Sequence, residues 1–131
     1  MNQAENKGKI KSFMDLIAWK EAHQLVLIIY DVTKGFPKEE IFGLVMQLRR
    51  AVVSITSNIA EGFSRQSYKD KIHFYSMALG SLTEVQNQIL VSKDIKYLAI
   101  EEFNKLVDRT VIVSKLLNGL IKSSKTLILN S

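Results

Sequence analysis

The stretch KEEIFGLVMQLRRAVVSITSNIAEGF, residues 38–63, decides the fold class of this sequence. It contains no proline, and its apolar residues recur at the i, i+3, i+4 and i+7 spacing of one helix face. Pro37 and the acidic pair that follows it suit the first turn of a helix, and Gly62 suits its end. The stretch therefore predicts a long α-helix whose buried face consists of Ile41, Leu44, Leu48, Val52, Ile55 and Ile59.

Three further segments show the same periodicity, over residues 15–34, 67–93 and 100–123. Gly35 ends the first segment, and Ser67 with Asp70 forms a capping-box pattern that begins the second. Because short loops join long helices, neighbours in sequence run antiparallel, which predicts an all-α, up-down-up-down antiparallel four-helix bundle. The predicted buried residues of the last two helices are Ile72, Tyr75, Leu79, Leu82, Val85, Ile89, Phe103, Leu106, Val107, Val113, Leu117 and Leu120.

The chain has 131 residues, of which 47% are hydrophobic and 24% charged, and this suits a single globular domain. We expect a flexible basic N-terminal arm at residues 1–14, the four-helix bundle at 15–124 and a C-terminal tail at 125–131. The chain lacks cysteine, which excludes disulfides, thiolate catalysis and cysteine-bound metals. No signal-peptide pattern is visible, and the apolar run Leu25–Tyr30 is far shorter than the ~20 residues of a membrane span. We therefore expect a cytoplasmic protein with no membrane partner.

Two of the helices carry apolar residues on a second face. Leu25–Tyr30 wraps fully around the first helix, and the helix at 38–63 has a second apolar set roughly 100° from its buried face. A simple interpretation is a wide core stripe with scattered exposed aliphatic side chains. We favour an oligomer interface, because large exposed apolar patches are rare on monomers. The residues predicted for this interface are Phe42, Met46, Val53 and Ala60.

A continuous polar stripe, here called the polar seam, lies opposite the predicted buried face of the same helix. Six residues of this helix fall within an arc of roughly 80°: Gln47, Arg50, Ser54, Asn58, Glu61 and Arg65. A similar polar face, with Gly80, Glu84 and Asn87, recurs on the next helix. One interpretation is a solvated face with a hydrogen-bond ladder from Arg50 through Ser54 to Asn58. The other is a network between subunits or the lining of a central channel. The seam residues are Gln47, Arg50, Ser54, Asn58, Glu61 and, from the next helix, Glu84.

The sequence contains no recognisable catalytic or metal-binding pattern. Carboxylate-bridged metal sites in helix bundles need Glu-x-x-His on two helices, and the single analogue here is Asp70 with His73. Arg65 and His73 do not reproduce the Arg–His spacing of small helical ribonucleases. Phosphate-binding loops, H-E-x-x-H and nucleophile elbows do not occur. We therefore expect no enzyme activity, no cofactor and no metal.

Three segments resemble the bacterial four-helix-bundle family named for the 23S rRNA intervening-sequence protein. They are FMDLIAWKEAHQL (13–25), FPKEEIFGLVMQLRRAVVSITSNIAEGFSR (36–65) and FYSMALGSLTEVQNQI (74–89). The resemblance covers about residues 13–121 and implies a homopentameric ring of bundles. A related branch is similar to the accessory proteins of diversity-generating retroelements, which are basic, bind nucleic acid and contact a reverse transcriptase.

The net charge of +5 is compatible with a nucleic-acid partner. We expect a non-enzymatic, pentameric scaffold that binds RNA or DNA through backbone phosphates. The alternative is a protein-interaction scaffold, with a reverse transcriptase or another protein as partner and no nucleic-acid role. Arg49 and Arg50 are expected to pair internally with Glu61 and Glu84. The residues predicted to contact phosphates are Lys7, Lys9, Lys11, Arg65, Lys69 and Lys71.

Overall fold

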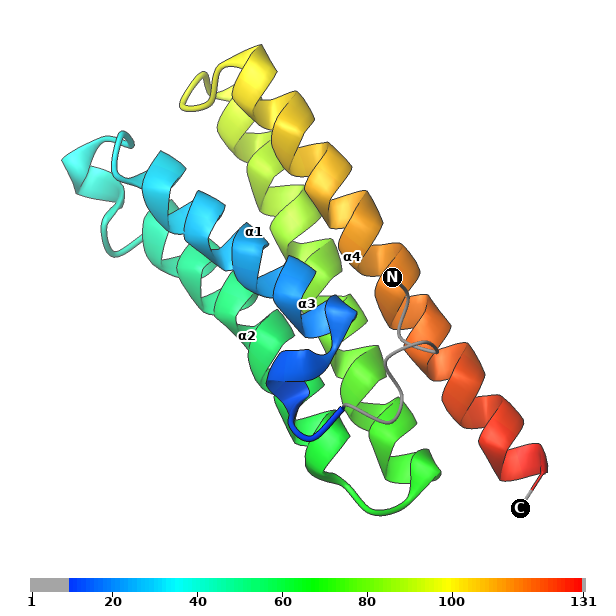
Figure 1. Cartoon of the computed structure of the whole chain (residues 1–131). Helices are drawn as coiled ribbons and strands as arrows, with labels where there is room; N and C mark the ends of the chain where they lie inside the picture. The colour runs from blue at the N-terminus through cyan, green and yellow to red at the C-terminus, as the bar shows by residue number, and fades with distance from the viewer. Residues whose placement is uncertain (1–9, 131) are drawn as a thin grey trace.

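The computed structural model of the chain describes residues 10–130. Within this range four α-helices run alternately up and down and pack in chain order, and α1 closes the bundle against α4 (Figure 1). This arrangement confirms the predicted all-α, up-down-up-down four-helix bundle. The elements are the 3-10 turn η2 (Phe13–Asp15), α1 (Ile17–Thr33), the 3-10 turn η3 (Lys38–Glu40), α2 (Leu44–Ser64), α3 (Tyr68–Asp94) and α4 (Ile100–Leu129).

Helix α2 begins at Leu44, later than the sequence predicts. Residues 38–40 form the turn η3 instead, and Gly43 interrupts helical geometry with φ −109° and ψ −114°. The carboxylate of Glu40 accepts the backbone N–H of Leu44 at 3.2 Å and so caps the first turn of α2. Because Ile41 lies before the helix, its side chain is 52% exposed, and its prediction as a buried residue is wrong.

The boundaries of α3 and α4 differ in how well the sequence predicts them. The N–H of Asp70 donates to Ser67 Oγ at 3.1 Å, which confirms the predicted start of α3. Helix α4 continues to Leu129, so the segment predicted as a C-terminal tail is mostly helical. Ser124 is buried and donates its hydroxyl to the carbonyl of Leu120 at 2.9 Å. The polypeptide beyond residue 123 therefore still contributes to the packed side of α4.

The hydrophobic core lies between the four helices and receives side chains from each of them. The largest fully buried side chains on α2, α3 and α4 all belong to the predicted buried faces. Ala78 on α3 and Val45 on α2 are also buried core residues, and the helical periodicity did not predict them. The largest fully buried side chains are Leu25, Ile29, Leu48, Val52, Ile55, Ile59, Leu82, Val85, Ile89, Leu106, Val113 and Leu117.

The corner between α2 and α3 depends on two close contacts. A Cβ atom at Gly62 would lie 2.6 Å from Cε1 of the buried Tyr75, so a glycine is needed for α2 to approach α3 this closely. Lys71 Nζ donates to the carbonyl oxygens of Phe63 at 2.7 Å and Gly62 at 3.3 Å. These bonds satisfy carbonyls at the C-terminus of α2 that lack partners within the helix. Burial lowers the pKa of Lys71.

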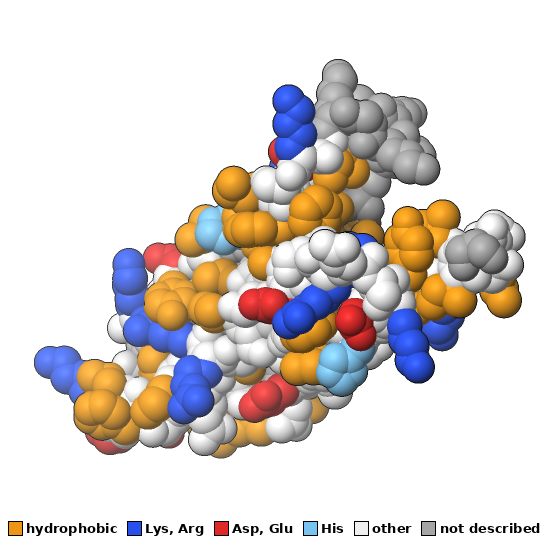
Figure 2. Space-filling model, turned by 90° about the horizontal axis from the view of Figure 1, so that it is seen from below, with side chains coloured by type: hydrophobic (Ala, Val, Ile, Leu, Met, Phe, Trp, Pro, Cys, Tyr) orange, Lys and Arg blue, Asp and Glu red, His pale blue; other side chains and the backbone are white. Residues whose placement is uncertain are grey.

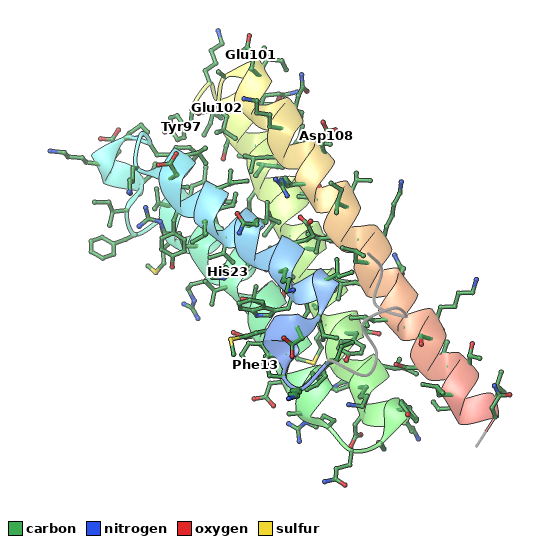
Figure 3. The ribbon with its side chains drawn as sticks, viewed as in Figure 1. Phe13, His23, Tyr97, Glu101, Glu102 and Asp108 are labelled. Atoms are coloured by element: carbon green, nitrogen blue, oxygen red, sulfur yellow. The ribbon has the colours of Figure 1, made fainter. Side chains whose placement is uncertain are left out.

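Polar contacts also join the other neighbouring elements. At the end of the bundle where Figure 3 labels Tyr97, its hydroxyl donates to Glu40 Oε2 at 3.0 Å. This hydrogen bond raises the pKa of Tyr97. Arg109 on α4 donates to Glu21 on α1 at 2.7 Å, and both side chains are partly exposed. The bonds connect η3 to the α3–α4 turn and α1 to α4.

Candidate assembly surface

An open, mostly apolar groove runs along the outer surface of α1 and α2, and we call it the α1–α2 groove. Its volume is about 660 Å³. Phe42 stands at one end with 86% of its surface exposed, and Ile41 and Val53 are also exposed, at 52% and 37%. The groove is lined by Tyr30, Ile41, Phe42, Val45, Met46, Arg49, Arg50, Val53, Ser54 and Ser57.

Three of the four predicted interface residues, Phe42, Met46 and Val53, line this groove together. Ala60 does not, because it lies further along α2 in a separate hollow that it shares with Phe13. Sequence reasoning missed Tyr30 as a neighbour of α2. The only signal for it was the apolar run around α1, which does not show which face meets the groove.

Arg49 occupies a structural position at the C-terminus of α1. Its Nε–H donates to Thr33 Oγ1 at 3.0 Å and its Nη2 donates to the carbonyl of Tyr30 at 3.3 Å. The guanidinium also lies 4.6 Å from the centroid of the Tyr30 ring. Since the carbonyls at a helix C-terminus carry partial negative charge, the arginine caps α1 and joins it to α2.

The predicted pairing of Arg49 and Arg50 with acidic residues is wrong. Glu61 pairs at 3.2 Å with Arg65, the residue that follows the last residue of α2. Arg50 is exposed at the rim of the groove, and among residues 10–130 its side chain makes no hydrogen bond or ion pair. It is therefore available to a group outside this chain.

The polar seam lies along the contact between α2 and α3. Ser81 Oγ donates to Ser54 Oγ at 2.9 Å across the two helices. Asn58 Nδ2 donates to the carbonyl and hydroxyl oxygens of Ser54 at 2.9 and 3.1 Å, which supplies the Asn58–Ser54 part of the predicted ladder. Within the described chain Arg50 does not extend this ladder.

Gln88, which the sequence prediction did not include, joins the other members of the seam. Its Nε2 donates to Gln47 Oε1 and to Glu84 Oε1, each at the long distance of 3.4 Å. Gln88 is 6% exposed, and its Oε1 has no partner in the part of the chain that the structure describes. Gln88 follows Glu84 by one helical turn, and this spacing could have indicated from the sequence that Gln88 belongs to the polar seam. Glu84 itself is exposed and only weakly held.

The structure describes four of the six predicted phosphate-contacting residues and gives them different surroundings. Lys7 and Lys9 lie outside the described residues. Arg65 pairs with Glu61 and covers the ring of Phe74 at 4.4 Å, while Lys71 caps α2. Lys11 and Lys69 are exposed. Seen from below the bundle, Lys and Arg side chains are separated by acidic, hydrophobic and uncharged ones (Figure 2), so this face offers no continuous basic patch.

A more uniform basic surface lies on the second half of α4. Residues 109–130 contain no aspartate or glutamate. Lys115, Lys122 and Lys125 are exposed there, and the first two are seven residues apart. Seven residues are two helical turns, or about 10.5 Å, so these two side chains lie on one face of α4.

Three aromatic rings lie in contact at the start of α1. Phe13 meets Trp19 edge to face with ring centroids 5.3 Å apart, and Trp19 stacks on His23 at 4.7 Å; Figure 3 labels Phe13 and His23. Within residues 10–130, His, Asp and Glu do not gather in a group of three that could hold a metal ion. No described helix has the length and apolar character that crossing a membrane requires.

Comparison with known proteins places the chain in a family. The sequence pattern of the 23S rRNA-intervening sequence protein family matches residues 14–119. The fold is similar to the 1.70 Å crystal structure of a Bacteroides thetaiotaomicron protein of unknown function from the S23 ribosomal protein family. The two chains are 23% identical, the match covers 81% of this chain and 96% of that one, and the TM-score is 0.75, which establishes a common fold. No curated protein matches the sequence. Because the family pattern spans most of the bundle, the chain belongs to the 23S rRNA-intervening sequence protein family.

Proposed function

We propose that this protein is a non-enzymatic scaffold that assembles with copies of itself through the α1–α2 groove. The observation that supports this proposal is the exposure of Phe42, 86%, beside a groove of about 660 Å³. The groove side chains are apolar groups, hydroxyls and arginines, which suit contact between proteins rather than proton transfer. The family resemblance implies a ring of five copies.

Covering Phe42 in an assembly raises the association constant by a measurable factor. Burying a phenylalanine side chain contributes about 1.5–3 kcal/mol, which corresponds to a change of roughly 10- to 100-fold in association constant. Each further copy in a closed ring adds one such contact. The groove therefore explains why an exposed aromatic side chain and a second apolar face occur on the same helix pair.

Light scattering on a sizing column tests the assembly. The wild-type protein is expected to be an oligomer at micromolar concentration, and Phe42→Ser is expected to dissociate at least tenfold more readily. Leu129→Ser is the matched control, because Leu129 is 84% exposed but lies at the end of α4. A monomeric wild type, or equal dissociation of the two variants, would overturn the proposal.

A second candidate function is binding to RNA or DNA through backbone phosphates. The observation that favours it is the second half of α4, where Lys115, Lys122 and Lys125 are exposed and acidic residues do not occur. Repeating this surface in an assembly gives several copies of a weak site and hence avidity. If binding is absent at low salt, the scaffold serves a protein partner instead, and the related retroelement branch makes a reverse transcriptase one candidate.

A further inference from the structure

We infer that the surface that fills the α1–α2 groove is the outward face of α3 around Gly80 on a second copy, with Arg50 of one copy paired to Glu84 of the next. This inference rests on the proposed assembly and identifies its second surface. We call the surface the Gly80 face. It consists of Met77, Gly80, Glu84 and Val91, which recur at helical spacing on the side of α3 opposite the buried Leu82 and Val85.

No contact or backbone conformation within residues 10–130 requires a glycine at position 80. It lies in the interior of α3, where glycine is less favourable than alanine. Its φ is not positive, and a Cβ added there would have no neighbouring heavy atom within 4 Å. Gly62, by contrast, is required because a Cβ would strike Tyr75. Because Gly80 has no side chain, another copy of the protein can approach the backbone of α3 closely at this exposed position.

The apolar residues of the Gly80 face complement the groove. Met77 is 44% exposed and Val91 is 41% exposed, one on each side of Gly80 along α3. The groove is also apolar, and Phe42 projects beside it. An apolar groove on α1 and α2 and a flat helix face with apolar residues on α3 therefore give matching surfaces on the two sides of the α2–α3 contact.

The charges at the two surfaces are of opposite sign, and neither forms an ion pair among residues 10–130. Arg50 lies at the rim of the groove without an ion pair or hydrogen bond among residues 10–130. Glu84 lies one turn after Gly80, and its contact in the described chain is the 3.4 Å hydrogen bond from Gln88. A carboxylate held this weakly can turn toward a guanidinium of another copy. Opposite charges at an interface determine which surfaces meet and in which register.

An interface made from two different surfaces leaves one of each unused at the ends of an open chain of copies. Such contacts close into a ring when the rotation between copies allows it. The assignment therefore predicts a head-to-tail contact, in which the groove of each copy receives α3 of the next.

Charge reversal with mixing of variants tests the pair. Arg50→Glu and Glu84→Arg are each expected to weaken assembly about tenfold or more, with helical content by circular dichroism unchanged. The double variant is expected to assemble like wild type. An equimolar mixture of the two single variants is expected to recover assembly, because each groove can then meet an opposite charge on a different chain. In a ring of five, one interface stays mismatched and the recovery is partial.

The outcomes separate this inference from the proposed function. A monomeric wild type overturns both. Assembly of wild type together with undiminished assembly of the two single variants overturns the inference and leaves the proposed function intact. If the double variant assembles but the mixture of single variants does not, Arg50 and Glu84 pair within one chain, and this result also overturns the inference.

A second pair of variants tests the flat face without changing charge. Gly80→Gln is expected to weaken assembly at least fivefold, while Gly119→Gln is not. Gly119 is the matched control, because it is an exposed glycine inside α4 with no heavy atom within 4 Å of an added Cβ. Equal assembly of the two variants would remove Gly80 from the interface.

Discussion

Replacement of Gly62 by alanine is the most direct test of the packing between α2 and α3. The new Cβ would lie 2.6 Å from Cε1 and 2.9 Å from Cδ1 of Tyr75, and 3.2 Å from Cβ of Phe74. Tyr75 is 3% exposed, so its ring has no free space to move into. Overpacking of this kind costs about 1–3 kcal/mol, and the better helix propensity of alanine offsets at most about 1 kcal/mol. We expect a net destabilisation of about 1–2 kcal/mol.

Gly119→Ala provides the comparison, because it makes the same chemical change in open space. It is expected to stabilise the protein by about 0.5–1 kcal/mol through helix propensity alone. Urea unfolding and thermal unfolding, each followed by circular dichroism and Trp19 fluorescence, measure both variants. One protein concentration is used throughout, since assembly makes the apparent stability depend on concentration. The two melting temperatures should differ by roughly 4 °C per kcal/mol. If Gly62→Ala is as stable as Gly119→Ala, the described contact between α2 and α3 is wrong.

Three further predictions concern single side chains and the basic surface. Burial raises the pKa of Tyr75 to about 12. The stability that the buried, neutral phenol contributes is therefore fully present below pH ~10 and is lost between pH 10 and about 12. In an alkaline titration followed by phenolate absorbance, Tyr75→Phe should lack the ionisation step that occurs at the highest pH. Lys71→Met removes the cap on α2 and should cost about 0.5–1.5 kcal/mol in urea unfolding, whereas the exposed Lys69→Met should change stability by less than about 0.5 kcal/mol. Duplex DNA binding that involves about four phosphates should show a log–log salt slope near −3.6, and Lys115→Glu with Lys122→Glu should reduce its magnitude by about 1.8; an unchanged slope would place the binding surface elsewhere.

Most of the fold could be predicted from the helical spacing of apolar residues and from the residues that begin and end helices. The buried faces of α3 and α4 and the Ser67 cap follow from local spacing, which the sequence displays directly. The start of α2 was wrong because apolar spacing continues through Ile41, although the backbone there forms a 3-10 turn ended by Gly43. Periodicity records which residues suit a helix face and does not record where a glycine interrupts the backbone.

The candidate site could be predicted only in part, because it depends on how the helices are rotated against one another. Phe42, Met46 and Val53 were found from the single stretch 38–63, since all three line the outward-facing groove. The partner of Arg49 could not be found this way, because it is the end of α1, which folding brings beside α2. Lys71 was interpreted as a phosphate ligand for the same reason: its bond to the last carbonyls of α2 is not visible in the sequence.

The tight corner between α2 and α3 also bears on the order in which the bundle folds. Residues 65–67 alone join these two helices, so bringing them together costs little chain entropy. Gly62 and Lys71 then hold the joined ends by close packing and by capping. We expect the α2–α3 hairpin to form in the folding transition state and to exchange its amide hydrogens most slowly. The opposite side, where Glu21 and Arg109 connect α1 to α4, is then the place at which the native bundle opens first.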